Sequence, residues 1–468
     1  MTARLLTTPI PAGSPHVPVA IVGGGACGLT AALMLQDAGI ACVVLERDAT
    51  PSGSTALSSG FIPAAATRAQ QAQGIDDDAL RFAADIQAKT RGTAADHLVT
   101  AYAQASGPAL DALQTRHAID FDVLDTFLYP GHSSFRMHCV PEKTGAALMA
   151  RLLAAAGKTG LPIVTHAWVQ SLHQDPSGRI SGLGYARPDG SVEHLSFDVL
   201  LLACNGFGGN AAMVNALLPE MRGASFAGHA GNDGSAIAWG RALGARLADL
   251  GGYQGHGSWA VPQGALISWA LMMEGGIQVN AQGNRFHDES QGYSEAAVNV
   301  LAQPGSLAWN VFDDPILALA RTFPDFCEAQ QAGAVKTCTD VDALAKWINC
   351  PASALQNALN ETAVLPGKPD GVTARVFKRV LKPPFYAVKV TGALFHTQGG
   401  LDIDEQCRVL RDDGAPFANL LAAGGAARGV SGNAVWGYLS GNGLLSAVAG
   451  GYIAAQTASD IIHARGEV

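Results

Sequence analysis

The sequence lacks paired cysteines, long apolar runs and clusters of basic residues, and each absence excludes a class of protein. Its eight cysteines are scattered and no two form a CxxC pair, which argues against a metal, iron–sulfur or CxxCH haem site. No apolar run reaches the roughly 18 residues that a membrane span requires. The net charge is −9 and no run of five or six lysines or arginines occurs, so neither nucleic acid nor an anionic membrane is an expected partner.

Cysteine usage and the first residues favour a cytoplasmic protein. Several cysteines lie inside apolar runs, where a free thiol behaves as a small buried hydrophobic group, and this usage fits a reducing compartment. The first 18 residues hold one arginine and an apolar stretch too short for a secretory signal. With 468 residues, 48% of them hydrophobic, the chain is long enough for two or three packed units.

Glycine, in contrast, is abundant, and its first cluster carries a nucleotide-binding signature. The strand VAIV is followed by Gly23-x-Gly25-x-x-Gly28, then by an Ala/Leu pattern of helical period and a second apolar strand that ends at Glu46. In this βαβ context the glycines allow a tight turn and close approach of a pyrophosphate, while the helix N-terminus supplies N–H donors. The acid at 46 is placed to accept from ribose hydroxyls.

The rest of the chain falls into three further regions. Residues 161–205 predict a second group of strands, with residues 199–203 as a central parallel strand buried on both faces. Residues 251–391 contain mixed short helices and few runs typical of buried strands, which indicates an inserted second domain. From about residue 392 the glycine-rich pattern returns and ends in a helix of small residues, suited to close packing.

Many ordered motifs across nearly the whole chain make it resemble the fumarate reductase and 3-ketosteroid dehydrogenase superfamily of flavoproteins. The matching segments include GGGACGLTAA, STALSSGF, LLACNGFGG, GNDGSAIAWGRALGA, GGIQVNAQGNRF, HTQGGLDID and LLAAGG. The resemblance implies an α/β fold: a Rossmann-like, GR2-type FAD-binding domain formed by residues 1–250 and 396–468, with an inserted α+β capping domain at residues 251–395.

FAD is the cofactor that this resemblance implies. The segment STALSSGF forms a loop of small hydroxyl residues, called here the small-hydroxyl loop. Members that attach FAD covalently carry a histidine just before the threonine of this loop; here Ser54 precedes Thr55, so the flavin is expected to be non-covalent. A separate electron acceptor or donor is the expected partner. The residues expected to hold FAD are Gly23, Gly25, Ala26, Cys27, Gly28, Glu46, Arg47, Ser54, Thr55, Ser58, Ser59, Gly60, Val169, Ala203, Asn205, Gly206, Asn232, Asp233, Gly400, Gly424, Gly425, Gly441 and Leu444.

Tyrosines replace both arginines that characterise the fumarate reductases. The acid of those enzymes lies eight residues beyond the arginine of an RF-x-NE segment, and counting from Arg285 gives Tyr293. The arginine that grips a substrate carboxylate lies about forty residues beyond the histidine of HTxGG, and from His396 that region offers Tyr438. The resemblance therefore favours the ketosteroid dehydrogenases, in which one tyrosine is the base and a second holds the ketone oxygen with a backbone N–H four residues later, here that of Asn442.

Three further residues complete the predicted catalytic set. A phenol near pKa ~10 is a poor base unless its anion is stabilised, and Tyr129 is the candidate for the third tyrosine that helps in that family. His256 and His396 fall where fumarate reductases carry substrate-binding histidines. They can hydrogen-bond a carboxylate or a carbonyl.

The leading hypothesis is an FAD-dependent dehydrogenase that introduces a C=C bond alpha,beta to a ketone in a small-molecule substrate. Tyr293 would remove the alpha proton and flavin N5 would accept the beta hydride. A steroid, another cyclic ketone or an oxocyclohexane carboxylate is the expected substrate class. The alternatives are an ene-reductase of an unsaturated carboxylate or enone, and a redox-inactive flavin-binding subunit.

Overall fold

The computed structural model describes residues 3–363, 375–377 and 379–466, and the chain divides into two compact units. The first comprises Met1–Leu217, Gly228–Tyr253 and His396–Val468, and the second comprises Leu218–Ala227 and Gln254–Phe395. Residues 218–227, which the sequence analysis placed in the first domain, thus belong to the second unit. Within the described ranges, no helix is both long enough and apolar enough to cross a bilayer.

The first unit is built on a mixed sheet of nine strands among the described residues. The strand order is β1-β8-β9-β10-β2-β3-β7, and β21 pairs with both β10 and β20. The strands are β1 Arg4–Leu6, β2 His16–Val22, β3 Cys42–Leu45, β7 Ile163–Val164, β8 Trp168–Gln174, β9 Ile180–Ala186, β10 Val192–Leu202, β20 Arg408–Leu410 and β21 Pro416–Ala422. The predicted central strand is confirmed, because β10 runs parallel to β2 and β21 and Val199 to Leu202 are fully buried.

Helices and smaller strands complete the first unit. Its helices are α1 Ala26–Asp37, α2 Gly53–Ala56, α3 Arg68–Ala72, α4 Ala79–Lys89, α5 Asp96–His117, α6 Gly145–Thr159, α7 Ala211–Leu217, α8 Ser235–Leu243 and α15 Asn442–Gly466. β4 Ile62–Pro63 and β5 Asp122–Val123 pair with β6 Met137–Cys139, and β12 Leu247–Ala248 pairs with β19 Gly400–Leu401.

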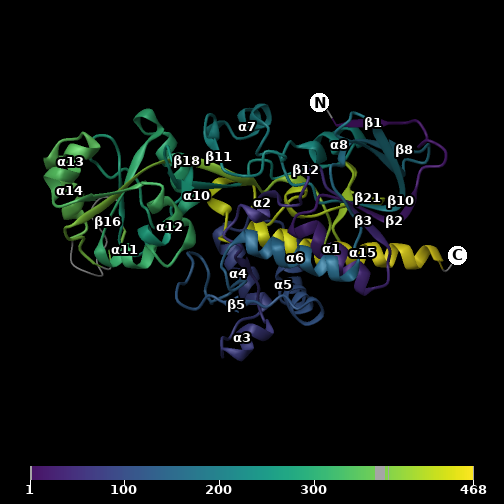
Figure 1. The fold of residues 1–468 in the computed structure, drawn as a ribbon, viewed down its shortest axis with the longest axis horizontal. Helices are drawn as coiled ribbons and strands as arrows, with labels where there is room; N and C mark the ends of the chain where they lie inside the picture. Colours follow the sequence, from purple (N-terminus) through teal and green to yellow (C-terminus); the bar gives the residue numbers. More distant parts are fainter. Residues whose placement is uncertain (1–2, 364–374, 378, 467–468) are drawn as a thin grey trace. The chain divides into compact units, whose positions relative to one another are not determined.

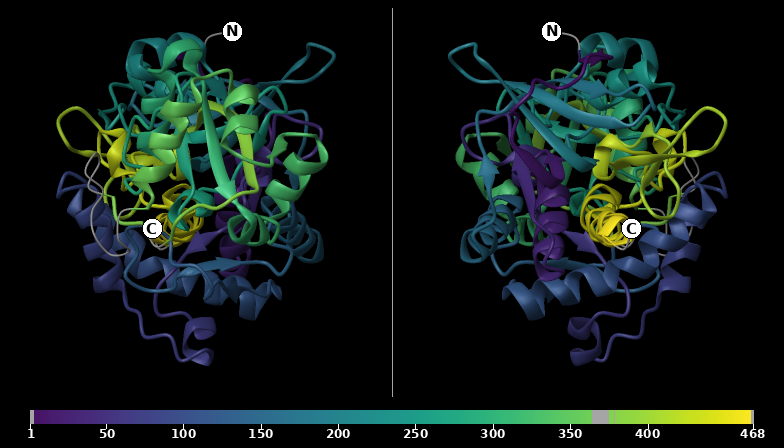
Figure 2. Two further views of the ribbon diagram at one scale, coloured as in Figure 1. Left: turned by 90° about the vertical axis from the view of Figure 1, so that its left-hand side faces the viewer. Right: turned by 90° about the vertical axis from the view of Figure 1, so that its right-hand side faces the viewer.

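The predicted βαβ unit is confirmed by β2, α1 and β3, and the C-terminal helix α15 lies alongside α1 (Figures 1 and 2). A side chain at Gly451 would come within 2.5 Å of the backbone oxygen of Cys27. Small residues in α15 therefore let two buried helices approach closely, as the sequence pattern indicated.

The second unit contains a sheet of seven strands in its described part, so the expectation of few buried strands was wrong. The order is β14-β13-β18-β16-β15, with β11 and β17 also pairing with β18. The strands are β11 Ser225–Phe226, β13 Tyr253–Ala260, β14 Ala265–Leu266, β15 Ile277–Val279, β16 Ala308–Asp313, β17 Val335–Cys338 and β18 Phe385–Thr397. Their interiors hold buried polar residues, such as Ser258, Gln278 and Asn310, which weakened the apolar signal that the sequence analysis relied on.

Helices of the second unit agree with the mixed α+β expectation. They are α9 Ala270–Met273, α10 Tyr293–Leu301, α11 Asp314–Ala320, α12 Pro324–Gln331, α13 Val341–Ile348 and α14 Ala352–Glu361. The last two were expected as short helices. Helix α10 begins at Tyr293, the predicted base.

Candidate functional site

The glycine motif forms the turn between β2 and α1. Gly23 has a φ of +111°, and a Cβ there would lie 2.4 Å from the carbonyl oxygen of Ala203, while a Cβ on Gly28 would lie 1.9 Å from that of Gly23. Only glycine satisfies this packing. At Gly25, in contrast, the nearest atom to an added Cβ is Thr55 Oγ1, at 3.5 Å. The N-cap of α1 is this glycine, which has no side chain of its own to cap the helix, and the N-terminus of α1 suits a pyrophosphate.

Glu46 and Arg47 anchor the loops next to this turn. The Glu46 carboxylate accepts from the backbone N–H groups of Gly24, at 2.9 Å, and Asp48, at 3.0 Å. Each carboxylate oxygen has a further lone pair for a ribose hydroxyl. Arg47 donates to the carbonyl of Gly231 at 3.0 Å and lies 3.4 Å from the Asp233 carboxylate, so two predicted cofactor residues meet.

Ser54 is the centre of a second group of predicted cofactor residues. Its Oγ accepts from Asn232 Nδ2 at 2.9 Å, from Asn205 Nδ2 at 3.2 Å and from the backbone N–H of His229 at 3.3 Å. Thr55 Oγ1 accepts from the N–H of Ala26 at 3.1 Å, at the start of α1. The small-hydroxyl loop therefore ties the glycine motif to the turn at 205–206 and to Asn232.

Several predicted cofactor glycines are already required by contacts within the protein. A Cβ at Gly206 would lie 2.0 Å from Thr397 Oγ1, one at Gly425 2.1 Å from Asn205 Oδ1, and one at Gly400 2.5 Å from a backbone oxygen. These close approaches are to the chain itself. The prediction that the glycines approach FAD stays a prediction.

Other predicted cofactor residues take up varied positions. Ser58 donates to the carbonyl of Thr55 at 2.7 Å and accepts from the N–H of Gly60 at 3.1 Å, so it shapes its own loop. Val169 is buried in β8, and Gly441 has a φ of +87° just before α15. The N-terminus of α1, the Glu46 carboxylate and the small-hydroxyl loop together fit a dinucleotide such as FAD.

In the first unit, Tyr438 is paired with His396. The tyrosine hydroxyl lies 3.5 Å from His396 Nε2, and the two rings are in an edge-to-face arrangement with centroids 5.5 Å apart. Burial lowers the pKa of His396 to about 4, so the ring is neutral near pH 7. The backbone N–H of Asn442 donates to the carbonyl of Leu439 at 3.1 Å; its predicted role at a ketone oxygen is not tested.

In the second unit, Tyr293 is paired with His256. Their rings stack with centroids 4.8 Å apart and an interplanar angle of 18°. Trp269 also contacts this imidazole in an edge-to-face arrangement, with ring centroids 5.9 Å apart. Burial lowers the pKa of His256 to about 3, and its Nδ1 accepts from the backbone N–H of Ser258 at 3.1 Å. The neutral ring therefore carries its proton on Nε2.

Tyr129 lies in an aromatic group of the first unit. Its ring centroid is 5.0 Å from that of Phe127 and 6.1 Å from that of Phe61. These contacts neither support nor oppose its predicted role beside the base.

Two buried ion clusters were not among the predicted site residues. Arg136 binds Asp77 through two hydrogen bonds, at 2.9 and 3.0 Å, and Asp85 through one, at 2.6 Å. In the second unit Glu289 is fully buried and binds Arg285 at 2.7 Å and Arg375 at 2.9 Å. These guanidinium groups lower the Glu289 pKa to about 2 against its desolvation. Glu289 ends the RFHDE segment, so the same segment that locates Tyr293 also supplies a buried anion.

Sequence reasoning also missed Gln398, which lies two residues beyond His396 and donates to its Nδ1 at 3.1 Å. Residues two apart in extended chain share a face, and this spacing within HTQGG was the signal available.

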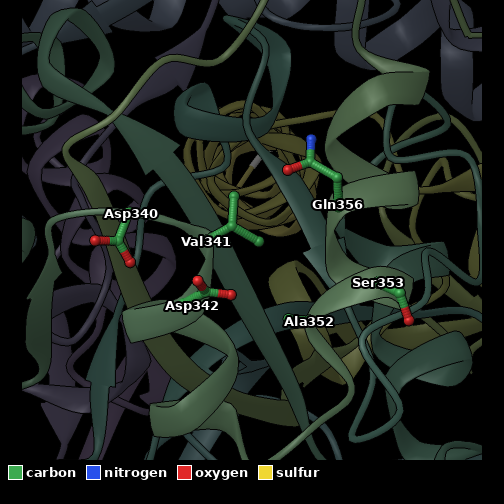
Figure 3. A pocket seen from close by; sticks show the side chains of 6 residues that line it. All are labelled: Asp340, Val341, Asp342, Ala352, Ser353 and Gln356. Atoms are coloured by element: carbon green, nitrogen blue, oxygen red, sulfur yellow. The ribbon is translucent and has the colours of Figure 1, made fainter.

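A surface hollow in the second unit is separate from these groups. It is lined by Asp340, Val341, Asp342, Ala352, Ser353 and Gln356 at the starts of α13 and α14 (Figure 3). None of the predicted site residues lines it. In the described residues, no group of three or more His, Cys, Asp or Glu side chains is placed to hold a metal ion.

Comparison with known proteins decides the family. The model of the FAD binding domain family matches residues 18–444. The chain belongs to the FAD binding domain family. FAD as cofactor, the expected α/β fold and the assignment to FAD-dependent oxidoreductases are confirmed at this level.

Similar members of this FAD-binding family include reductases and a dehydrogenase. The chain is 26% identical to an NADH:fumarate oxidoreductase of Klebsiella pneumoniae over 88% of this chain, but it spans only 45% of that relative. It is 25% identical to a 4-oxocyclohexanecarboxylate 2-dehydrogenase of Sinomonas cyclohexanicum, over 87% of each chain.

Solved structures of the family agree with the fold. The open conformation of a flavocytochrome c3 fumarate reductase matches with a TM-score of 0.81 and 25% identity, over 96% of this chain and 79% of the other. A 3-ketosteroid delta1-dehydrogenase from Sterolibacterium denitrificans matches with a TM-score of 0.78 and 21% identity, over 96% of this chain and all of the other. The likeness to the 3-ketosteroid delta1-dehydrogenase concerns the fold alone.

Proposed function

We propose that the protein is an FAD-dependent dehydrogenase that introduces a C=C bond alpha,beta to the carbonyl of a cyclic ketone. The observation that carries this proposal is the presence of two tyrosine–histidine pairs, Tyr293 with the buried His256 and Tyr438 with the half-buried His396, in which desolvation keeps both imidazoles neutral. Phenols and neutral imidazoles suit a neutral carbonyl group better than a dicarboxylate, which a guanidinium binds more strongly.

Tyr293 is proposed as the group that removes the alpha proton. It is the first residue of α10, where side chains lean toward the helix N-terminus and its partial positive charge stabilises an anion. The stacked His256 excludes water from one face of the phenol without adding a competing charge. General base catalysis by such a group typically contributes 10²–10⁴-fold.

Tyr438 is proposed to donate a hydrogen bond to the ketone oxygen. This bond strengthens as enolate-like charge develops on that oxygen, so it lowers the barrier to loss of the alpha proton. FAD, when bound, supplies the acceptor for the beta hydride, and a separate electron carrier restores the oxidised flavin. The balanced result is an enone, two protons and two electrons: the alpha hydrogen leaves as a proton, and the beta hydride ends as a second proton and the two electrons passed to the carrier.

A small alicyclic keto acid is the favoured substrate class. The similarity to a 4-oxocyclohexanecarboxylate 2-dehydrogenase over 87% of both chains supports an oxocyclohexane carboxylate over a steroid. Reduction of an unsaturated carboxylate or enone is the second candidate, because several relatives are fumarate reductases. The cytoplasmic location stays a prediction.

One experiment separates the two reactions. The purified protein with bound oxidised FAD is mixed anaerobically with cyclic ketones, including 4-oxocyclohexanecarboxylate, and the flavin absorbance is followed. Bleaching by a ketone is expected. In parallel, the dithionite-reduced protein is mixed with fumarate, acrylate and cyclic enones; reoxidation by the acids, with no bleaching by any ketone, would support the reductase instead.

A further inference from the structure

The Tyr438–His396 contact is the last in a row of four hydrogen bonds within the first unit. Asn442 Nδ2 donates to Ser431 Oγ at 3.0 Å, and Ser431 Oγ donates to Gln398 Oε1 at 2.8 Å. Gln398 Nε2 donates to His396 Nδ1 at 3.1 Å, and His396 Nε2 lies 3.5 Å from the Tyr438 hydroxyl.

With the oxygen and nitrogen atoms of the Gln398 and Asn442 amides placed as in the structure, this row has one direction. An amide oxygen only accepts, so the serine hydroxyl must donate to Gln398; an amide NH₂ only donates, so Nδ1 of the imidazole must accept. A neutral imidazole with an accepting Nδ1 carries its hydrogen on Nε2. The hydroxyl oxygen of Tyr438 then accepts from His396 Nε2, and the hydroxyl hydrogen of Tyr438 points to a different acceptor.

We propose that Gln398 is a positioning residue that fixes the tautomer of His396 and thereby directs the Tyr438 hydroxyl hydrogen toward the substrate's carbonyl oxygen. Without this constraint, a hydrogen on Nδ1 would point to the carbonyl of Thr397, 3.4 Å away. Nε2 would then accept from Tyr438 and turn its hydrogen away from the substrate.

Burial supports this role. Gln398, Ser431 and Asn442 are at most 3% exposed, so water does not readily replace any of their bonds. Burial also keeps His396 neutral, with its pKa at about 4, and a neutral ring has one hydrogen to place. The role of the substrate as final acceptor rests on the proposed function, whereas the tautomer of His396 does not.

The decisive variant is Gln398→Glu, which keeps the size and shape of the side chain. A carboxylate cannot donate to Nδ1 but accepts from it, so the tautomer reverses while Ser431 keeps its acceptor. The exposed Gln406→Glu makes the same chemical change elsewhere in the first unit and is the matched control.

The first readout is the protonation of His396, independent of any substrate. ¹⁵N-histidine NMR at pH 8, with the signals assigned through His396→Gln, should show Nδ1 bare and Nε2 protonated in the wild type. The pattern should reverse in Gln398→Glu and stay unchanged in Gln406→Glu. A wild-type ring protonated on Nδ1 would overturn the inference, even if the protein proves inactive with ketones.

The second readout is turnover with the ketone that bleaches the flavin. For Gln398→Glu with full flavin content we expect kcat to fall about a hundredfold, the usual effect of losing one oxyanion donor, with little change in KM. Both changes remove the proposed hydrogen bond from the Tyr438 hydroxyl to the substrate's carbonyl oxygen. The double variant Gln398→Glu with Tyr438→Phe should therefore be no slower than Tyr438→Phe alone. Wild-type kcat in Gln398→Glu, or fully additive losses in the double variant, would contradict the proposal.

Discussion

The two tyrosine–histidine pairs use the same side chains but hold the imidazole in different ways. In the pair of the second unit, His256 Nδ1 accepts from the backbone N–H of Ser258. In the pair of the first unit, His396 Nδ1 accepts from the side chain of Gln398. Backbone donors survive any substitution except proline, whereas a side-chain donor can be replaced. One tautomer is therefore set by the fold, and the other by a single replaceable residue.

Geometry separates the pairs as well. His256 stacks face to face on Tyr293, while His396 meets Tyr438 edge-on and within hydrogen-bonding distance of its hydroxyl. A stacked ring shields a phenol and leaves its oxygen to another partner, which suits a base. A ring that donates to the phenol oxygen orients the hydroxyl, which suits a hydrogen-bond donor. The difference fits the two tasks proposed for these tyrosines.

Phenylalanine substitutions should separate these tasks with the largest effects. We expect Tyr293→Phe to lower kcat by about 10²–10⁴-fold, because the proton acceptor is lost, and Tyr438→Phe to lower it by roughly 10²-fold, because an oxyanion donor is lost. Steady-state turnover with a ketone substrate at matched flavin content is the measurement.

Two other tyrosines serve as controls for these variants. Tyr386 of the second unit hydrogen-bonds to Asp314, and Tyr185 of the first to Glu193. Tyr386→Phe and Tyr185→Phe should keep turnover within about twofold. If Tyr438→Phe were slower than Tyr293→Phe, the assignment of base and donor would have to be reversed.

Lowering the pH should reduce the free energy of unfolding, because the buried His256 stays neutral in the folded protein. The folded-state pKa of His256 is about 3, below its ordinary 6.5, so below pH 6.5 the unfolded chain binds the proton more readily and stability falls with pH. At pH 5 this amounts to about 2 kcal/mol. The stability that Glu289 contributes is lost only as the pH falls from its ordinary pKa of 4.5 toward its folded-state pKa of about 2. Glu289 therefore contributes little to the change between pH 7 and pH 5.

Urea unfolding at pH 7 and pH 5 measures this effect. His256→Phe, which keeps a stacked ring, should reduce the pH-dependent loss by about 2 kcal/mol. His396→Phe should reduce it by a similar amount, because at pH 5 the folded-state pKa of His396, about 4, also leaves that ring neutral. Equal pH dependence in the wild type and His256→Phe would show that the ring is not held neutral by burial.

The smallest effect is expected for Ser258→Ala. This change keeps the backbone N–H that fixes His256, so kcat should stay within about threefold. The Ser258 hydroxyl accepts from Asn310, and its loss leaves a buried amide with one bond fewer, at a cost of about 1–3 kcal/mol in unfolding free energy. If Ser258→Ala lowered kcat as much as Gln398→Glu does, the contrast between a backbone donor to His256 and a side-chain donor to His396 would be wrong.

Most of the fold could be predicted from local sequence signals. The glycine motif between β2 and α1 and the apolar run of β10 follow patterns that depend only on neighbours in the chain. The sheet of the second unit could not, because β13, with its glycines, histidine and serine, does not read as a buried strand. Its stability depends on partners such as Gln278 and Asn310 from other strands, which periodicity does not reveal.

The candidate site shows the same division. Tyr293 was predicted by counting from Arg285, and the structure adds its stack on His256, from a strand 37 residues earlier in the chain. Gln398 occupies the variable position of HTxGG and Ser431 lies in no quoted motif, so their contacts with His396 and Asn442 appear only in the folded structure. Spacing thus gave the candidate reacting groups, which stay predictions, whereas the residues that contact them required the three-dimensional structure.

The most direct test of the account is the single-turnover rate of flavin reduction in Tyr293→Phe. The variant, loaded with FAD as fully as Tyr386→Phe and the wild type, is mixed anaerobically with the ketone that bleaches the wild-type flavin fastest. The account predicts that Tyr386→Phe bleaches at the wild-type rate and that Tyr293→Phe is slower by at least about a hundredfold. Bleaching of Tyr293→Phe at the wild-type rate would contradict the assignment of this phenol as the proton acceptor.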